Sequence, residues 1–182
     1  MLNVDNTVLL LIDFQAKITP AIHNHEALVR RAAAYVKGCQ ILNVPVIATQ
    51  QYTKGLGETV QTLKDVIEVY EPIEKETFSC CGDEVFVDKL GVLGRKNVIV
   101  TGIEAHICVQ QTVLDLLKAE YNVYVAADGV GSRNETDRMY AEKRMREAGA
   151  VFSTIESILF ELLVRGDHPK RKDITYLILN ID

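Results

Sequence analysis

The sequence predicts an α/β fold in which a doubly wound, mainly parallel six-stranded sheet, in strand order 3-2-1-4-5-6, carries helices on both faces. Two observations lead to this prediction. Short, mostly β-branched apolar runs alternate along the chain with stretches whose apolar residues recur at three-four spacing. The short runs are apolar at successive positions, which is typical of strands covered on both faces.

Six segments have the strand pattern. The first reads Val-Leu-Leu-Leu-Ile from Val8. Pro45 lies near the start of the second, where a missing N–H donor is tolerated. The third is the least regular of the set. The predicted strands are residues 8–12, 44–48, 70–73, 98–101, 123–127 and 151–152.

Helical stripes lie between these strands. Apolar residues at three-four spacing predict helices over residues 28–42, 109–117 and 155–162. Residues 132–135 and 153–156 have the Ser-x-x-Glu spacing of a capping box, so we expect Ser132 and Ser153 to cap helices.

Helix ends follow a second pattern. Asn43, Asn97, Asn122 and Gly149 each precede a predicted strand. Asparagine and glycine tolerate the left-handed conformation that closes a helix, so we expect these four residues to adopt it.

The composition is that of a single domain, residues 1–182, with residues 167–182 as a surface helix or arm. The net charge is −5, and no basic cluster is denser than residues 170–172, so we expect neither a nucleic-acid partner nor a membrane surface. No run of about 20 apolar residues and no signal peptide is visible. The four cysteines are therefore expected to be free thiols in the cytoplasm.

Chemistry is expected where the winding of the sheet reverses. In the order 3-2-1-4-5-6, the first and fourth strands are neighbours, and ligands bind beyond their carboxyl ends. Asp13 ends the first strand, and Cys108 lies in the first turn of the helix that follows the fourth. We expect the two side chains to face each other across about one strand spacing, ~4.8 Å, plus side-chain reach.

Both residues also have simpler interpretations. Asp13 is equally an ordinary capping or solvated carboxylate, but the apolar run before it favours a desolvated charge with a role. Cys108 is equally a small buried apolar residue, but the start of a helix favours a thiolate.

The other cysteines and His106 are weaker candidates. Cys39 falls on a helical core stripe and is interpreted as a packing residue. Cys80 and Cys81 are either pocket-lining or packing residues. His106 is two residues from Cys108, and such residues point to nearly opposite sides of a helix, so a Cys–His pair is disfavoured.

Lys75 lies in Glu-Lys-Glu, which by itself indicates a solvated run of charges. The strand before it is two positions from the first strand, so topology alone does not bring Lys75 to Asp13.

Metal and dinucleotide sites are not expected. His23 and His25 flank Asn24, and no HxxxH or CxxC group accompanies them. The turn after the first strand, residues 14–17, lacks the glycine-rich fingerprint. We therefore predict no cofactor.

Three motifs in order resemble the isochorismatase-like cysteine hydrolase family, which includes nicotinamidases. They are Leu-Leu-Ile-Asp-Phe-Gln at residues 10–15, Lys-Glu-Thr-Phe-Ser at 75–79 and Val-Thr-Gly-Ile-Glu-Ala-His-Ile-Cys-Val at 100–109. The similarity runs from about Thr7 to Leu163.

This resemblance implies the same doubly wound sheet and an Asp–Lys–Cys catalytic triad formed by Asp13, Lys75 and Cys108. It also implies a cis peptide between Ile103 and Glu104, with the amides of Glu104 and Cys108 forming an oxyanion hole. By position only, Phe14, Tyr52, Phe78 and Ile103 are predicted to line the substrate pocket.

The chain departs from the nicotinamidases in one region. Those enzymes bind zinc through one Asp and two His after the second strand, whereas residues 49–57 read Thr-Gln-Gln-Tyr-Thr-Lys-Gly-Leu-Gly. The resemblance is therefore to the metal-free branch. Isochorismate cleavage is disfavoured too, because that enzyme lacks the catalytic cysteine.

The resemblance implies a hydrolase that cleaves a small amide-type C–N bond through a thioester, acting as a homo-oligomer, a dimer or larger. Two other functions are compatible with the sequence: a catalytically silent binding protein, and a cysteine redox sensor in which Cys80 or Cys81 resolves a sulfenic acid.

Overall fold

The computed structural model describes residues 1–181 and contains a six-stranded, all-parallel sheet. The strand order is β3-β2-β1-β4-β5-β6, so the predicted fold class and order are confirmed. The chain winds first outward through β2 and β3, then returns to the far side of β1. The strands are β1 (Thr7–Ile12), β2 (Val46–Gln51), β3 (Ile73–Lys75), β4 (Asn97–Ile103), β5 (Asn122–Gly131) and β6 (Val151–Ser153).

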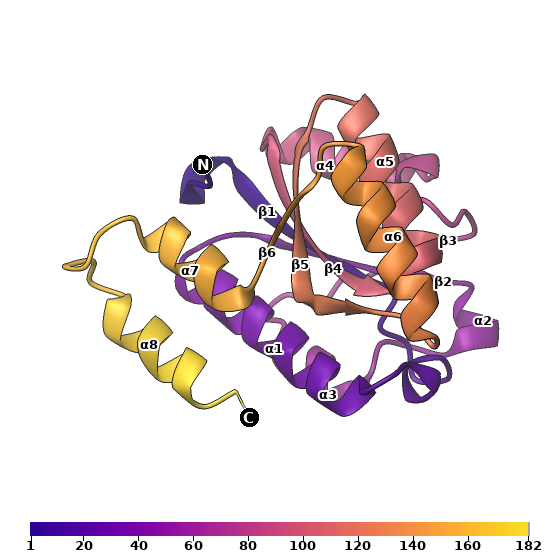
Figure 1. Cartoon of the computed structure of the whole chain (residues 1–182), viewed down its shortest axis with the longest axis horizontal. Coiled ribbons are helices and arrows are strands. Elements are labelled where there is room, and N and C mark those ends of the chain that lie inside the picture. The colour runs from indigo at the N-terminus through magenta and orange to yellow at the C-terminus, as the bar shows by residue number, and fades with distance from the viewer. Residues whose placement is uncertain (182) are drawn as a thin grey trace.

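Helices cover both faces of the sheet (Figure 1). Helices α1, α7 and α8 pack together on one face, whereas α4, α5 and α6 lie on the other. The helices are α1 (His25–Ile41), α2 (Thr53–Leu56), α3 (Gln61–Lys64), α4 (Glu84–Leu93), α5 (Gln110–Lys118), α6 (Glu135–Glu147), α7 (Ile155–Leu163) and α8 (Arg171–Leu179).

Strand β1 shows why the apolar runs do not alternate with polar residues. Leu9 and Leu11 belong to the core on the α1 side, whereas Val8, Leu10 and Ile12 belong to the core on the α5 side. All five side chains are at most 1% exposed. Because both faces are covered, every position of the strand must be apolar until the strand ends at its carboxyl edge.

Two predicted strands are displaced in the structure. The segment predicted at 44–48 begins at Val46 and continues through Gln51, and Pro45 precedes it, its carbonyl accepting a hydrogen bond from Leu9 N. The segment predicted at 70–73 begins at Ile73 and ends at Lys75. In both cases polar residues at the carboxyl end continue the ladder, which a search for apolar runs excludes.

The predicted capping boxes are wrong. Helix α6 begins after Asn134 and α7 after Thr154, and neither residue caps its helix with a side chain. Ser132 instead contacts His106, while Asp128 in β5 accepts a hydrogen bond from Ile155 N at 3.2 Å. A carboxylate from a neighbouring strand thus satisfies the first turn of α7.

The left-handed helix ends are confirmed at Asn43 (φ 59°) and Gly149 (φ 109°). The prediction is wrong for Asn97 and Asn122, which are the first residues of β4 and β5. Gly94 and Glu120, each at φ 61°, take the left-handed conformation in their place.

The segment after residue 166 contains α8. Ile174 is fully buried among the side chains of the α1-side core, so this helix is part of that layer. Tyr176 and Leu179 on the same helix are exposed.

Candidate active site

Asp13 follows the last residue of β1 and lies at the carboxyl edge of the sheet. Its backbone is left-handed (φ 54°), a conformation that Asp tolerates better than most residues. The side chain is 3% exposed. Its Oδ1 accepts a hydrogen bond from Thr49 Oγ1 at 2.7 Å, and its Oδ2 lies 2.7 Å from Lys75 Nζ. A buried carboxylate is therefore held at both oxygens.

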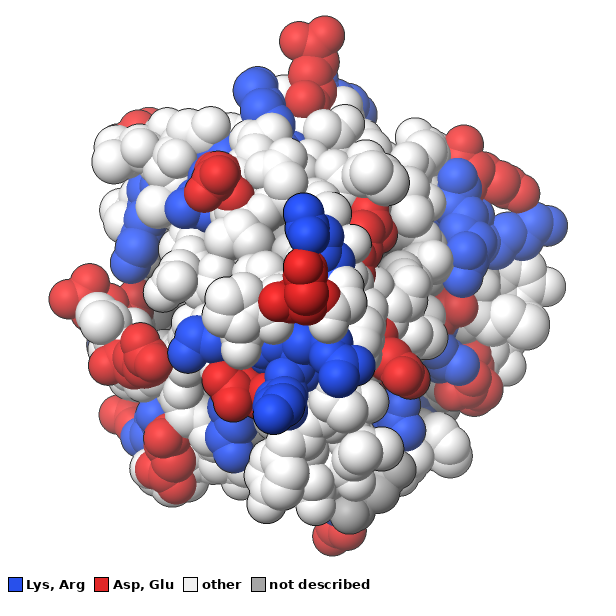
Figure 2. Space-filling model, turned by 90° about the vertical axis from the view of Figure 1, so that its left-hand side faces the viewer, with Lys and Arg blue, Asp and Glu red and all other residues white. Residues whose placement is uncertain are grey.

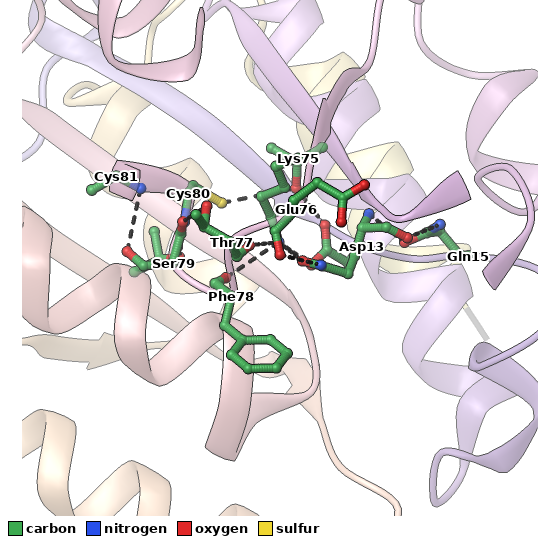
Figure 3. Close-up of polar contacts among 12 residues, drawn as sticks. Asp13, Gln15, Lys75, Glu76, Thr77, Phe78, Ser79, Cys80 and Cys81 are labelled. Atoms are coloured by element: carbon green, nitrogen blue, oxygen red, sulfur yellow. Dashed lines mark hydrogen bonds and ion pairs between the residues drawn. The ribbon is translucent and has the colours of Figure 1, made fainter. Parts of the chain in front are cut away.

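Lys75 reaches Asp13 from two strands away (Figure 3). It is 1% exposed, so the interpretation as a solvated charge is wrong. Besides Asp13, its ammonium donates to Gln51 Oε1 at 2.8 Å and to the carbonyls of Thr77 and Phe78 at 3.1 and 3.2 Å. The strand positions do not bring the two residues together, but the four-carbon side chain of Lys75 extends past β2.

Cys108 lies on the α5 side of the sheet, in a π-helical turn, Ala105–Val109, that precedes α5. The thiol is 7% exposed. Burial raises the pKa of Cys108 above its usual range, and the charge of Asp13 and a hydrogen bond to it raise that pKa further, whereas Lys75 lowers it in part. The prediction of a resting thiolate is therefore wrong: desolvation outweighs the start of the helix.

The charge on Lys75 responds to the same environment in the opposite sense. Burial alone lowers the pKa of Lys75, but the negative charge of Asp13 and the nearby thiols of Cys80 and Cys108 outweigh it. The pKa of Lys75 is consequently raised. At neutral pH the raised pKa values therefore favour an ammonium group at Lys75 and a protonated thiol at Cys108.

Thr49 and Gln51 complete the site, and sequence reasoning missed both. Thr49 donates to Asp13, and Gln51 accepts from Lys75 while its Nε2 donates to the Glu76 carbonyl at 2.8 Å. The signal was available, since both are polar residues at the carboxyl end of a strand beside β1. Because the second strand was predicted to end at residue 48, they fell outside it.

Cys80 is a second thiol at the site. It is fully buried, and its Sγ lies 3.9 Å from Thr49 Oγ1. Its backbone N donates to Thr112 Oγ1 in α5, one turn after Cys108. Burial and the charge of Asp13 raise the pKa of Cys80 to about 12.

The remaining candidates lie apart from this cluster. Cys39 is fully buried on the α1 side of the sheet, where burial raises its pKa to about 12, in agreement with its interpretation as a packing residue. His106 Nδ1 lies 3.0 Å from Ser132 Oγ. Cys81 is partly buried, and burial raises its pKa to about 11.

The turn between β4 and Cys108 contains Glu104 and Cys108, whose amides are predicted to form an oxyanion hole. The peptide between Ile103 and Glu104 is cis. The Glu104 carbonyl accepts from Ile107 N and Val109 N at 3.0 and 3.3 Å. Within residues 1–181, no oxygen is recorded as accepting a hydrogen bond from Glu104 N, and the use of this amide by a ligand stays a prediction.

Gly102 sets how closely this turn approaches Asp13. It pairs with Ile12, and a Cβ at position 102 would lie 2.7 Å from the Ile12 carbonyl oxygen and 3.1 Å from its Cα. Those atoms belong to the backbone and cannot move aside as a flexible side chain would. A side chain here would separate the two strands that carry the site.

The four predicted pocket residues fall into two groups. Phe14 and Ile103 are each 1% exposed and belong to the α1-side core. Tyr52 and Phe78 are 49% and 55% exposed. Both contact Lys75 through their backbone, since Tyr52 N donates to the Lys75 carbonyl and the Phe78 carbonyl accepts from Lys75 Nζ. The ring of Phe78 extends away from Asp13 and Lys75 (Figure 3). Lining of a substrate pocket by these residues stays a prediction.

The carboxyl end of β2 holds amide side chains near the region where the nicotinamidase resemblance places metal ligands. Gln50 Oε1 accepts from Thr59 N, Thr59 Oγ1 and Tyr70 OH, at 2.9, 3.1 and 2.8 Å. No group of three or more His, Cys, Asp or Glu side chains within residues 1–181 is arranged to hold a metal ion.

The surface carries charges of both signs. Figure 2 shows Lys and Arg side chains interspersed with Asp and Glu on the face that it presents. Among the helices of residues 1–181, none has the length and apolar character to cross a membrane.

Known proteins share the sequence and the fold of this chain over most of its length. Residues 7–157 match the family described as Isochorismatase domain. Isochorismatase domain-containing protein 2 of Danio rerio is 38% identical over 177 residues, which cover 97% of this chain and 89% of the relative.

Solved structures show the same fold. MAR1 ribonuclease from Caenorhabditis elegans is 40% identical with a TM-score of 0.93, covering 98% of this chain and 92% of its own. YcaC from Escherichia coli, which is described as an octameric hydrolase of unknown specificity, is 25% identical with a TM-score of 0.88. YcaC from Pseudomonas aeruginosa, whose structure contains hexane-2,5-diol and covalent acrylamide, has the same identity and TM-score. The alignments cover 99% and 97% of this chain and 88% and 87% of those chains. The matched residues, the sheet order and these relatives show that the chain belongs to the isochorismatase family.

Proposed function

We propose that this protein is a single-domain, cysteine-dependent hydrolase that cleaves the C–N bond of a small amide through a thioester. Membership of the isochorismatase family supports a hydrolytic function. The observation that carries the finer proposal is the buried Asp13–Lys75 ion pair at 2.7 Å, which lies near enough to Cys108 for the charge of Asp13 to raise the pKa of that thiol. In this proposal Asp13, Lys75 and Cys108 are the catalytic residues.

The first step transfers the Cys108 proton to Asp13 as sulfur attacks the amide carbonyl carbon. A protonated resting thiol requires this coupling, because the raised pKa of Cys108 leaves little thiolate at neutral pH. The new S–C bond pushes the carbonyl electron pair onto oxygen. Lys75 offsets the negative charge that develops at sulfur while the proton moves.

The tetrahedral oxyanion then accepts hydrogen bonds from the amides of Glu104 and Cys108. One donor of this kind contributes about 3 kcal/mol to lowering a barrier. As the intermediate collapses, the C–N bond breaks and the departing nitrogen takes the proton from Asp13. The carboxylate is thereby restored, and the acyl group remains on sulfur.

Hydrolysis of the thioester completes the cycle. Asp13 accepts a proton from water, the hydroxide adds to the thioester carbonyl, and the S–C bond breaks. The leaving sulfur recovers the proton held by Asp13. The products are a carboxylic acid and ammonia or an amine, and the enzyme returns to its protonated thiol.

The test is a search for a trapped acyl-enzyme. The protein is mixed with a panel of small primary amides and carbamoyl acids, and its intact mass is followed on the millisecond-to-minute scale. We expect at least one compound to give an adduct on Cys108 and to release ammonia. Acrylamide belongs in the panel because it is covalently bound in Pseudomonas aeruginosa YcaC, and its alkylation product reports thiol access independently of hydrolysis.

Two variants control this experiment. Cys108→Ala removes the proposed nucleophile, whereas Cys39→Ala removes a fully buried thiol on the opposite side of the sheet. Adduct formation should vanish in the first and persist in the second. The reverse result, or an adduct that survives in Cys108→Ala, would refute the assignment.

The alternative functions give different products. A disulfide between Cys108 and Cys80 or Cys81 after mild peroxide, without any acyl adduct, would indicate a redox sensor. Absence of both would indicate a binding protein.

Assembly and partners are part of the same proposal. Escherichia coli YcaC is octameric, and we propose a homo-oligomer here, to be measured by light scattering. The four free cysteines support a reducing compartment such as the cytoplasm. The absence of a nucleic-acid partner stays a prediction, and the Caenorhabditis elegans relative described as a ribonuclease makes an RNA-cleavage assay its direct test.

A further inference from the structure

A second charged group lies beside the site at the end of β4. The side chain of Glu104 is 2% exposed, and it directly follows the cis peptide. Its Oε2 accepts from Arg133 N at 3.1 Å, and its Oε1 accepts from Arg133 Nε at 3.0 Å. The proposed reaction gives this carboxylate no proton to move and no atom of the substrate to contact.

This pair joins two segments that the sequence separates. Glu104 belongs to the turn that leads to Cys108, whereas Arg133 belongs to the loop between β5 and α6. A second link runs parallel to it, since His106 Nδ1 lies 3.0 Å from Ser132 Oγ. Residues 104–106 are thus attached at two points to residues 132–133.

The attachment acts on the backbone that the reaction uses. The carbonyl of Glu104 is bonded to Ile107 N and Val109 N, while its carboxylate is bonded to Arg133. With the side chain and the carbonyl both restrained, the orientation of the Glu104 amide is restrained as well. The π-helical turn that carries Cys108 starts from this same residue.

From these contacts we infer that Glu104 and Arg133 are positioning residues that hold the oxyanion-binding turn in place. The inference rests on the proposed function, because it assigns the Glu104 amide to the oxyanion. Stability alone is a poor reason for burying the Glu104 carboxylate, since burial costs a charge several kcal/mol of solvation and the partner, Arg133, is itself half-exposed. Transition-state stabilisation, by contrast, requires donors fixed within fractions of an ångström.

The test compares two reactions of Cys108. Acylation by an amide builds an oxyanion, whereas alkylation by iodoacetamide displaces iodide and builds none. We expect Glu104→Gln to slow acylation about tenfold or more, with the change in kcat rather than KM, and to leave alkylation within twofold. Arg133→Gln, at a side chain that is 54% exposed, should show the same pattern more weakly, and Arg133→Lys should recover part of the loss.

Asp128→Asn is the matched control. Asp128, on β5, is another carboxylate paired with an arginine, Arg31, at 3.2 Å, but its other partners are Tyr35 OH and Ile155 N on the α1 side. It should lower stability without changing the ratio of acylation to alkylation. An unchanged ratio in both Glu104→Gln and Arg133→Gln, or an equal fall of both rates, would overturn the inference.

Hydrogen–deuterium exchange distinguishes failure of the positioning role of Glu104 and Arg133 from failure of the proposed function. If the wild-type protein forms no acyl adduct with any amide, the proposed function fails, and the positioning role is then judged on the backbone. Exchange over residues 103–109 should accelerate at least threefold in Glu104→Gln and not in Asp128→Asn. Unchanged exchange there would overturn the positioning role on its own.

Discussion

At the amino end of the sheet, Thr7, Asn97 and Asn122 form a chain of neutral hydrogen bonds, whereas at the carboxyl end Asp13 and Lys75 form an ion pair. Asn97 Nδ2 donates to Thr7 Oγ1 at 3.4 Å and Asn122 Nδ2 to Asn97 Oδ1 at 3.0 Å. Thr7 and Asn97 are as buried as Asp13 and Lys75. Thr7 and Asn97 therefore differ from Asp13 and Lys75 in charge and not in depth, whereas Asn122 is exposed.

This difference separates structural from chemical use of buried polar groups. Neutral amides and hydroxyls that satisfy one another lose little on burial. Opposite charges lose several kcal/mol of solvation each, and their attraction offsets that loss only with good geometry. Formation of the sheet does not by itself require buried charges at one end. We therefore expect variants at the carboxyl end to affect both the stability of the protein and the reaction.

The largest expected effect on stability comes from breaking the ion pair. Lys75→Met leaves the Asp13 carboxylate buried without its cation and should lower the free energy of unfolding at pH 7 by about 3–5 kcal/mol. The double variant Asp13→Asn/Lys75→Met should recover most of that loss, because neither charge remains. Urea denaturation of the wild type, Asp13→Asn, Lys75→Met and the double variant measures this. A double variant as unstable as Lys75→Met would contradict it.

Asp13→Asn should separate nucleophile ionisation from turnover. Because the charge of Asp13 raises the pKa of Cys108, its removal should move the pH midpoint of iodoacetamide alkylation downward. Amide turnover should nevertheless fall about a hundredfold or more, because no base remains to carry the proton to the leaving nitrogen. Parallel pH–rate profiles for the two reactions test this, and a turnover equal to wild type would remove Asp13 from the mechanism.

At the amino end, Asn97→Ala should cost about 1–3 kcal/mol of stability, because it removes the two side-chain hydrogen bonds that Asn97 makes with Thr7 and Asn122. Turnover should stay within twofold of wild type. Thermal unfolding and a steady-state assay provide the measurements. A large loss of turnover would show that the two ends of the sheet are coupled, which the contacts do not suggest.

The smallest effect is a pH dependence that Cys80 adds at the charged end. In the folded state the pKa of Cys80 is about 12, whereas in the unfolded chain it is ~8.5, so the unfolded state loses its proton first as pH rises. Stability from this group is intact below about pH 8.5 and is lost progressively above it, by about 1.4 kcal/mol at pH 9.5. The free energy of unfolding should fall less steeply with pH in Cys80→Ala than in Asn97→Ala.

The sequence was sufficient to predict the sheet because Val8–Ile12 and the other central runs are apolar at every position, which only a doubly covered strand requires. It also placed Asp13 and Cys108 at one edge, since parallel strands end together. It was insufficient for Lys75, whose backbone lies two strands away and whose long side chain supplies the contact. Thr49 and Gln51 were missed because polar residues ended the predicted strand too early.

Protonation was the other limit of sequence reasoning. The start of a helix favours a thiolate, but a sequence does not give the depth of a side chain, and burial reverses the direction of the Cys108 shift. Helix capping failed for a similar reason. Asp128 caps α7 from a neighbouring strand, and no local pattern contains that contact.

The close approach of Gly102 to Ile12 has a practical consequence for engineering new specificities in this enzyme family. Mutant libraries that randomise residue 102 will be dominated by misfolded members, because any β-carbon meets main-chain atoms there. Diversity is better placed at Tyr52 and Phe78, whose side chains are exposed and whose backbone atoms contact Lys75. In this fold, substitutions that change specificity are therefore expected to be tolerated at exposed positions beside Lys75 and not at residue 102.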